Sequence, residues 1–250
     1  MEGGTVTRAQ ADDTAPTVLE LEDVGKTFGT YRALDGLSLR LRAGEVFALL
    51  GPNGAGKTTT LNLILGFLAP DSGRIVLDGI DVAAEPLRAR QRSAYLPETV
   101  MLHPSLDAVE NLRYFALLGG YRLDAAQAHA LLDQAGLQRA AHTRRSNGYS
   151  KGMRQKVGLA IALAKQARVL LLDEPTSGLD ASAALELSAL VRTAAGRGMA
   201  VLMATHDLPR VCEVAHRIGI LREGQLVLQR DATKVPAAQL ETLYLDEVLA

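Results

Sequence analysis

The segment Gly51–Thr58 (GPNGAGKT) most constrains what this chain can fold into, because it fits the pattern G-x-x-x-x-G-K-[ST]. The apolar run Val46–Leu50 precedes it, and apolar residues at helical spacing follow it over Thr58–Leu68, so the order is strand, loop and helix. In that order the glycines let the backbone wrap around phosphate oxygens, and the amide groups at the helix start face the anion. The segment therefore predicts a phosphate-binding loop rather than a glycine turn that only caps a helix.

The side chains of this loop indicate its ligands. A lysine supplies a point charge for the phosphates and a threonine hydroxyl can ligate magnesium, so we expect Lys57 to serve binding and catalysis and Thr58 to hold Mg²⁺. ATP and Mg²⁺ are therefore the expected cofactors. In this segment and directly after it, the residues expected to contact ATP are Gly51, Asn53, Gly54, Ala55, Gly56, Lys57, Thr58 and Thr59.

Polar residues follow three other apolar runs that are typical of buried strands: Glu98 after Ser93–Leu96, Asp173 and Glu174 after Val169–Leu172, and His206 after Ala200–Ala204. In open parallel sheets, ligands bind beyond the carboxyl ends of the strands. These polar side chains are therefore expected to converge on the crevice that holds the glycine-rich loop.

The adjacent acids Asp173 and Glu174 indicate the chemistry. Two carboxylates at the end of a buried strand are costly unless a cation or hydrogen bonds compensate them. Taken alone, an acidic strand end is more often a loop boundary, but together with Lys57 it favours a magnesium ligand at Asp173 and a water-orienting base at Glu174. The expected reaction is hydrolysis of ATP.

The order of the patterns predicts an α/β fold of the P-loop nucleotide-hydrolase type with a mainly parallel sheet. Apolar residues alternate over residues 18–24 and 37–41, which indicates paired strands of an antiparallel β subdomain at the front. Helical patterns then replace strand signals, so we expect an inserted helical subdomain at about residues 98–167. A disordered tail is expected at residues 1–16, before one nucleotide-hydrolysing domain over residues 17–250.

Two further segments carry a family resemblance. Tyr149–Gln155 (YSKGMRQ) and Asp173–Asp180 (DEPTSGLD) resemble the signature motif and the extended second acidic motif of the ATP-binding-cassette (ABC) family. The order and spacing of the motifs match that family from about Val18 to the end of the chain. Tyr95–Glu98 (YLPE) and Tyr-Ser-Lys-Gly-Met are similar to the exporter group for drugs, sodium, polysaccharide and copper maturation. The resemblance implies that residues 17–250 form an ABC ATPase domain.

The resemblance implies a site shared by two chains. In the family two cassettes dimerise head to tail, and each signature helix caps the ATP held by the other's glycine-rich loop. Carried over to this sequence, Ser150 and Gly152, at a predicted helix start, and Asp180 contact ATP. An ordinary capped helix is the plainer explanation of Ser150, but it leaves Gly152 unexplained.

The resemblance also implies roles for a histidine and an aromatic ring. His206 matches the family's switch histidine, which reaches the terminal phosphate and acts in catalysis. Phe28 stands where the family places an aromatic ring against adenine. Tyr31 is the second candidate for that ring, and packing in the core is the alternative explanation of Phe28.

Two positions depart from the family's usual pattern. Glu98 stands where the family usually has the glutamine that approaches magnesium, and Lys151-Gly152-Met153 stands where it usually has Gly-Gly-Gln. A glutamate can still reach magnesium through water, so we expect Glu98 to contribute to the ATP and Mg²⁺ site. The exporter group often shares both changes, which are therefore interpreted as marks of that group.

Charge and cysteine content limit the partners. The 28 acidic and 27 basic residues nearly balance, which argues against nucleic acid as a partner. The single cysteine, Cys212, fits a reducing compartment, and the apolar runs are too short to cross a bilayer, so the expected location is cytoplasmic. The resemblance adds a separate membrane-spanning subunit and a second cassette, with a homodimer favoured, and so a peripheral position on the inner face of the cell membrane.

The function expected is therefore that of the ATP-hydrolysing subunit of an ABC transporter, an exporter by its resemblance, which works through ATP-dependent dimer closure. The alternative is a soluble ABC ATPase in iron–sulfur cluster assembly or another role outside transport. A nucleotide-binding regulator without turnover is disfavoured, because Lys57, Asp173 and Glu174 are all present.

Overall fold

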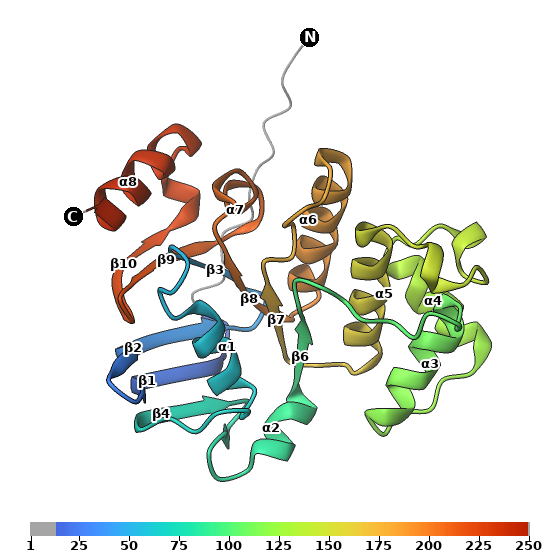
Figure 1. Ribbon diagram of the computed structural model, residues 1–250, viewed down its shortest axis with the longest axis horizontal. Coiled ribbons are helices and arrows are strands. Elements are labelled where there is room, and N and C mark those ends of the chain that lie inside the picture. The colour runs from blue at the N-terminus through green and yellow to red at the C-terminus, as the bar shows by residue number, and fades with distance from the viewer. Residues whose placement is uncertain (1–13, 250) are drawn as a thin grey trace.

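The computed structural model describes residues 14–249, in which two β-sheets lie beside a group of helices (Figure 1). The strands are β1 (Thr17–Phe28), β2 (Tyr31–Arg42), β3 (Val46–Leu50), β4 (Ser72–Leu77), β5 (Ile80–Asp81), β6 (Ser93–Leu96), β7 (Val169–Asp173), β8 (Ala200–Thr205), β9 (Arg217–Arg222) and β10 (Gln225–Asp231). The α-helices are α1 (Lys57–Ile64), α2 (Pro86–Arg92), α3 (Ala108–Leu118), α4 (Ala125–Gln134), α5 (Lys151–Ala164), α6 (Ala181–Gly196), α7 (Leu208–Val214) and α8 (Ala237–Leu249).

The larger sheet is mainly parallel, as the sequence predicts. Its strand order is β10-β9-β3-β8-β7-β6, and only the β9–β10 pair is antiparallel. Every residue of β3 and β8 is buried, because helices or the smaller sheet cover both faces of the larger one. The carboxyl ends of β3, β7 and β8 therefore meet at one edge.

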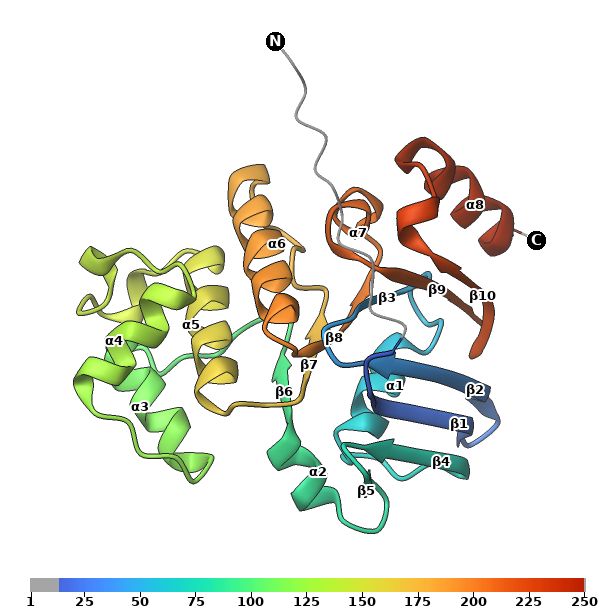
Figure 2. The ribbon, with the colours of Figure 1, turned by 180° about the vertical axis from the view of Figure 1, so that it is seen from behind.

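The smaller sheet is antiparallel and contains the strand pair predicted for the front. Its order is β2-β1-β4-β5, and Leu19 pairs with Leu41 and Leu21 with Leu39 across β1 and β2. These four leucines point to the same side because side chains alternate along a strand, and all are buried. Figure 2 shows this sheet next to α1, on the opposite side of the molecule from α3 and α4.

The larger sheet divides the core into two apolar clusters. Phe47 and Leu49 of β3 face the cluster shared with β1, β2 and α1, whereas Val46, Ala48 and Leu50 face the cluster shared with α3, α5 and α7. The division follows from the two-residue period of a strand. Both clusters fix β3, so the loop that follows β3 starts from a rigid point.

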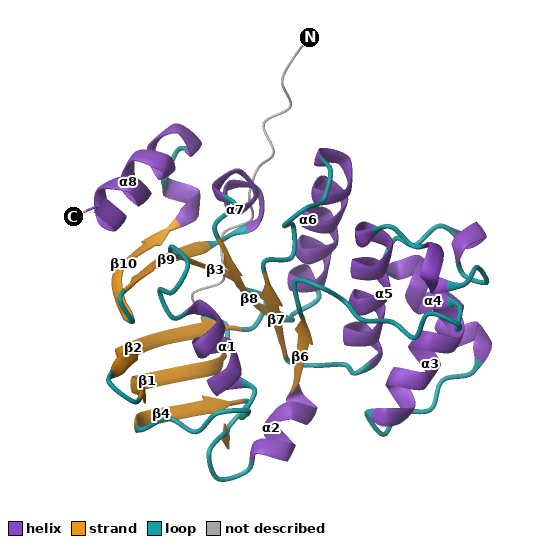
Figure 3. Cartoon of the chain, viewed as in Figure 1, coloured by secondary structure: helices purple, strands orange, loops and turns teal. Residues whose placement is uncertain are grey.

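The helices α3, α4 and α5 lie in the range where helical patterns replace strand signals (Figure 3). Helix α3 begins with a capping box, in which Asp107 accepts from the Glu110 amide and Glu110 accepts from the Asp107 amide. Asp124 and Gln127 form the same motif at the start of α4. The boundaries of a helical subdomain at residues 98–167 stay a prediction, and so does the disordered tail, of which residues 1–13 lie outside the described part of the chain.

One helix is shorter than its pattern. Apolar spacing predicts a helix to Leu68, but α1 ends at Ile64. Gly66 takes a left-handed conformation with φ 63°, and its amide and that of Phe67 turn back to the carbonyls of Leu63 and Asn62. This is the usual way in which a glycine ends a helix, so the local turn overrides the apolar spacing.

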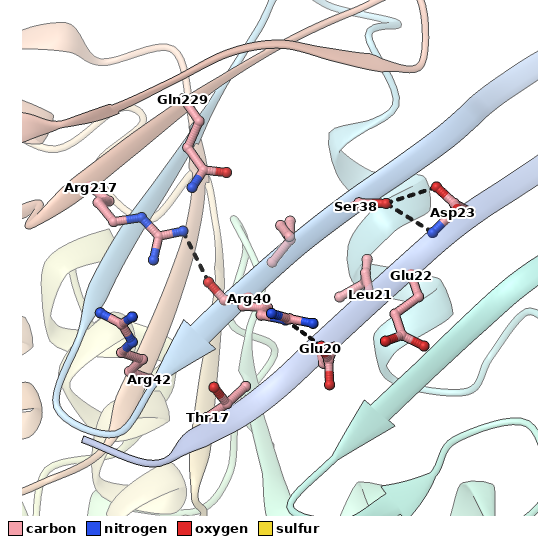
Figure 4. A pocket seen from close by; sticks show the side chains of 11 residues that line it. Thr17, Glu20, Leu21, Glu22, Asp23, Ser38, Arg40, Arg42, Arg217 and Gln229 are labelled. Atoms are coloured by element: carbon pink, nitrogen blue, oxygen red, sulfur yellow. Dashed lines mark hydrogen bonds and ion pairs between the residues drawn. The ribbon is translucent and has the colours of Figure 1, made fainter. Parts of the chain in front are cut away.

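A polar groove of about 680 Å³ lies beside β1, β2 and β9 (Figure 4). In the groove Arg40 pairs with Glu20. Arg217 donates to the Arg40 carbonyl at 3.1 Å and pairs with the buried Glu45 at 2.9 Å. Burial raises the pKa of Glu45, and the Arg42 amide and the Arg217 guanidinium oppose that effect. The contacts of Arg217 therefore connect the two sheets. None of the predicted site residues lines this groove.

Candidate nucleotide-binding site

A cleft of about 330 Å³ lies at the carboxyl ends of β3 and β7. It brings together residues that are far apart in the sequence, as the strand-end argument predicts. The lining residues are Tyr31, Pro52, Asn53, Gly54, Gly56, Lys57, Thr58, Thr59, Glu98, Asp173 and Glu174.

The glycines of the loop before α1 are required by its geometry. Gly54 and Gly56 have φ angles of 84° and 110°, which side chains rarely allow. A Cβ on Gly51 would lie 2.4 Å from the Leu221 carbonyl oxygen, and one on Gly56 would lie 2.6 Å from the Ala33 carbonyl oxygen. The loop can therefore keep this tight course only with glycine at these positions.

The Lys57 ammonium group lies inside this loop. Its Nζ donates to the carbonyl oxygens of Gly51 at 2.5 Å and Pro52 at 3.2 Å, and it lies 3.8 Å from Glu174. Burial lowers the pKa of Lys57, while the charges of Glu174 and Asp173 act in the opposite direction. A buried ammonium group held only by carbonyls and a distant carboxylate is well placed to bind an anion.

Asp173 ends β7 and meets a neighbouring strand. The Tyr95 hydroxyl of β6 donates to Asp173 Oδ2 at 3.2 Å. Burial raises the pKa of Asp173, and the nearby charges of Glu174 and Glu98 also raise it. Burial and the Asp173 charge raise the pKa of Tyr95 to about 12, so its hydroxyl remains a donor.

The residues around Asp173 fit a divalent cation. A half-buried carboxylate whose ionised form is disfavoured by burial and by other acids gains most from a nearby positive charge, and the Thr58 hydroxyl lines the same cleft. Within residues 14–249 no group of three or more histidine, cysteine, aspartate or glutamate side chains could hold a metal ion. Phosphate oxygens and water would therefore complete the coordination.

Glu174 is fixed in orientation by the strand next to it. Its amide donates to the Ala204 carbonyl at 2.9 Å, and its φ of 44° is a strained value for a glutamate. The Thr205 hydroxyl donates to Oε2 at 3.0 Å, and the His206 ring lies with Nδ1 2.9 Å from Oε1. The carboxylate predicted as the base and the predicted switch histidine are thus in direct contact.

The two candidate aromatic residues, Phe28 and Tyr31, are paired across the β1–β2 turn but differ in their contacts. Tyr31 lines the cleft, and its hydroxyl donates to the Gly54 carbonyl at 2.7 Å. Phe28 is outside the lining and 46% exposed, with the Lys26 ammonium 5.6 Å from its ring centroid. Tyr31 therefore braces the loop, while the Phe28 ring keeps a free surface.

The predicted ATP contacts outside the cleft lining are Phe28, the loop residues Gly51 and Ala55, and three residues at the starts of α5 and α6. Ser150 and Asp180 are exposed and cap the first turns of α5 and α6, where they accept from the amides of Met153 at 3.3 Å and Ala183 at 2.8 Å. Gly152 lies in the first turn of α5, and a Cβ there would come within 3.2 Å of the Ala183 Cβ. One chain alone therefore does not bring these three residues to its own loop.

Sequence reasoning assigned no role to two residues that position the site. Thr205 anchors Glu174, and Tyr95 anchors Asp173. Thr205 could have been found because it directly precedes His206 at a strand end. Tyr95 could not, because nothing in the sequence shows that β6 lies next to β7.

The comparisons identify the family of the chain. The family model for ABC transporters matches residues 34–177, and the chain belongs to the ABC transporter family. It is 37% identical to the Nod factor export ATP-binding protein I of Paraburkholderia xenovorans over 89% of this chain and 73% of that one. It is 37% identical to a daunorubicin resistance ATP-binding protein of Streptomyces coeruleorubidus, over 89% and 71% of the two chains, and 32% identical to the linearmycin resistance ATP-binding protein LnrL of Bacillus subtilis, over 84% and 68%.

Solved structures give the same answer. A dimeric ATP-binding cassette in a post-hydrolysis state, bound to ADP and Pi, aligns with a TM-score of 0.76 and 27% identity over 86% of this chain and 98% of its own. An ATP-binding subunit of an ABC transporter aligns with a TM-score of 0.77 and 29% identity over 93% and 98%. The predicted family, fold and exporter-type ATPase function are thus confirmed, and the soluble alternative gains no support. No helix within residues 14–249 has the length and apolar character needed to span a bilayer.

Proposed function

We propose that the cleft binds ATP with Mg²⁺, and that Lys57, Glu174 and His206 hydrolyse it. The observation that carries this proposal is the convergence of the loop after β3 and the acidic end of β7 on one cleft, where Thr205 and His206 at the end of β8 contact Glu174. Lys57 leaves the carbonyls of its own loop and pairs with phosphate oxygens instead, where its charge is better compensated. Thr59 and the amides of the loop contact the same phosphates.

Glu174 is proposed as the general base. Thr205 and His206 hold its carboxylate at the cleft, so it can orient a water molecule and accept its proton. His206 then stabilises the terminal phosphate. Thr58 and Asp173 would hold Mg²⁺, and Glu98 would reach it through water. The bound cation would neutralise part of the negative charge of the phosphates.

The partners proposed are a second copy of this chain and a separate membrane-spanning subunit. Ser150, Gly152 and Asp180 lie outside the cleft lining and so are available to the nucleotide of another cassette. One chain carries both halves of such a site, which favours a homodimer. The names of the relatives, which include export and drug resistance, support work on the inner face of the membrane as part of an exporter.

The variant Glu174→Gln tests this proposal. It keeps the shape of the side chain but removes the base, so hydrolysis falls about 10²- to 10⁴-fold while ATP still binds. A stable dimer then accumulates with ATP and Mg²⁺ and not with ADP. Phosphate release measures the rate, and light scattering coupled to size-exclusion chromatography measures the dimer.

Glu186→Gln is the matched control, because Glu186 lies on the outer part of α6 and pairs with Lys156. It should hydrolyse ATP at the wild-type rate. Undiminished hydrolysis by Glu174→Gln would remove Glu174 from its role. A protein that stays monomeric in excess ATP and Mg²⁺ would contradict unaided homodimer closure and indicate a different cassette or a need for the membrane subunit.

A further inference from the structure

The two departures from the family pattern meet in space. Glu98, which replaces the usual glutamine, and Lys151, which replaces the first glycine after the signature serine, lie 53 positions apart in the sequence. In the structure Lys151 Nζ is 3.6 Å from Glu98 Oε1. These two positions therefore carry side chains of opposite charge within ion-pair distance.

Helix α5 holds Glu98 at both its backbone and its side chain. Gln155 is buried and donates to the Glu98 carbonyl oxygen at 3.0 Å. Lys151 lies one turn earlier on the same face, four positions before Gln155, and reaches the carboxylate. Ser177, in the loop between β7 and α6, donates to the same Oε1 atom at 2.9 Å. Three segments of the motifs therefore meet at one carboxylate.

The charge of Glu98 affects the cleft. Asp173 and Glu174 already place two carboxylates there, and the Glu98 charge is one of the causes that raise the pKa of Asp173. Glu98 adds a third negative charge at the rim, and such a charge is stabilised by a nearby cation. Lys57 is hydrogen-bonded inside the loop, whereas Lys151 lies beside this third charge.

We propose that Lys151 is a positioning residue that acts through Glu98. In the nucleotide-free chain it pairs with the Glu98 carboxylate, offsets its charge and links the start of the signature helix to the rim of the cleft. When Glu98 turns toward the bound nucleotide and its metal, Lys151 loses this partner, so the start of α5 responds to the loading of the chain's own cleft. This inference rests on the proposed function of the cleft.

The exposure of the pair suits an exchange of partners. The Lys151 side chain is 31% exposed and that of Glu98 53% exposed, so water screens their attraction. Such a pair is weak enough to be replaced when a dication arrives, whereas the buried contact of Gln155 keeps the Glu98 backbone in place. The side chain can therefore move while its attachment point stays fixed.

The test is a double-mutant cycle on the KM for ATP. Lys151→Gln removes the ion pair with the Glu98 charge, which forms only before the nucleotide and its metal bind. No contact is then lost on binding, so the KM should fall about three- to five-fold, with a smaller change in kcat. In the E98Q background that charge is gone, so Lys151→Gln should then change the KM less than about two-fold. The difference between the two backgrounds should shrink as KCl is raised from about 0.05 to 0.5 M, because salt screens a partly exposed pair.

Two variants serve as controls. Lys151→Arg keeps the positive charge and should retain a KM near that of the wild type. Lys156→Gln removes the next lysine along α5. This lysine pairs with Glu186 on α6 and not with Glu98, so its loss should leave the KM unchanged. An equal fall in KM for Lys151→Gln in both backgrounds would show that Lys151 acts independently of Glu98. An unchanged or raised KM in the wild-type background would show that the pair does not compete with the nucleotide and its metal. Either result would overturn the proposal.

Failure of the proposed function gives a different result. If the wild-type chain does not bind ATP in equilibrium titration, the assignment of the cleft is wrong whatever the cycle shows. The ion pair is then judged by thermal unfolding of the four nucleotide-free proteins of the cycle. Changes in Tm that are not additive support the pairing of Lys151 with Glu98, and additive changes overturn it.

Discussion

The cleft and the start of α5 are both anion sites in the proposed function, but they are built differently. The cleft draws its groups from several segments, and Lys57, Asp173 and Glu174 are each held by contacts with other segments or loop carbonyls. The start of α5 has an exposed serine that contacts only its own helix. The first region is assembled by folding of one chain, whereas in the proposed function the second is completed by a partner.

This difference explains how one chain can be stable and yet incomplete. The strand ends around the cleft are buried and fixed by the sheet, so their side chains are preorganised for the phosphates. The first amides of α5 are satisfied by a cap that another molecule can approach. Substitutions in the cleft should therefore affect the single chain, and substitutions at α5 should affect the pair of chains.

The largest effect is expected from Lys57→Ala. It removes the charge that faces the phosphates and leaves the loop carbonyls of Gly51 and Pro52 pointing at the anion. ATP binding should weaken by about 100-fold or more, as expected for loss of charge-assisted hydrogen bonds. Equilibrium titration of the monomer with a fluorescent ATP analogue measures this. Affinity near that of the wild type would contradict the assignment of the loop.

A smaller effect on the monomer, but a complete effect on the dimer, is expected from Ser150→Arg. A bulky cation at the first residue of the signature helix blocks close approach to the partner's nucleotide, and it lies outside the lining of its own cleft. In the E174Q background the ATP-dependent dimer should disappear, while ATP binding by the monomer changes less than about two-fold. Light scattering checks the mass. A dimer that persists would contradict the proposal that the start of α5 binds the nucleotide of the partner.

The fold was predictable where one pattern dominates. The run Val46–Leu50 is apolar throughout and is a buried strand, and the alternation over residues 37–41 marks an antiparallel one. The interval between β3 and β6 was not predicted in detail. Strand β4 has only two buried residues, and α2 has seven residues of which only Ala89 is buried, so neither carries a usable period.

The site was predictable as a set of strand ends, but its contacts were not. The carboxyl ends of parallel strands meet by a general rule, and this rule places Lys57, Asp173 and Glu174 in one cleft. The contact of Glu98 with Lys151 depends on how α5 packs beside β6, for which no sequence rule exists. The positions of the two aromatic rings depend on the turn between β1 and β2, where both strand pairing and exposure permit either ring.

The smallest effects are expected from substitutions of these two rings. They distinguish a ring that stacks on adenine from a ring that stabilises the loop. Phe28 has a free face, so we expect it to stack on adenine, and Phe28→Ala should raise the KM about three- to ten-fold with little change in kcat. Tyr31→Phe removes only the hydrogen bond to Gly54 and should raise the KM less than about three-fold. Steady-state kinetics of both variants decides between the rings. If Tyr31→Ala raises the KM and Phe28→Ala does not, then Tyr31, which already lines the cleft, is the ring that meets adenine.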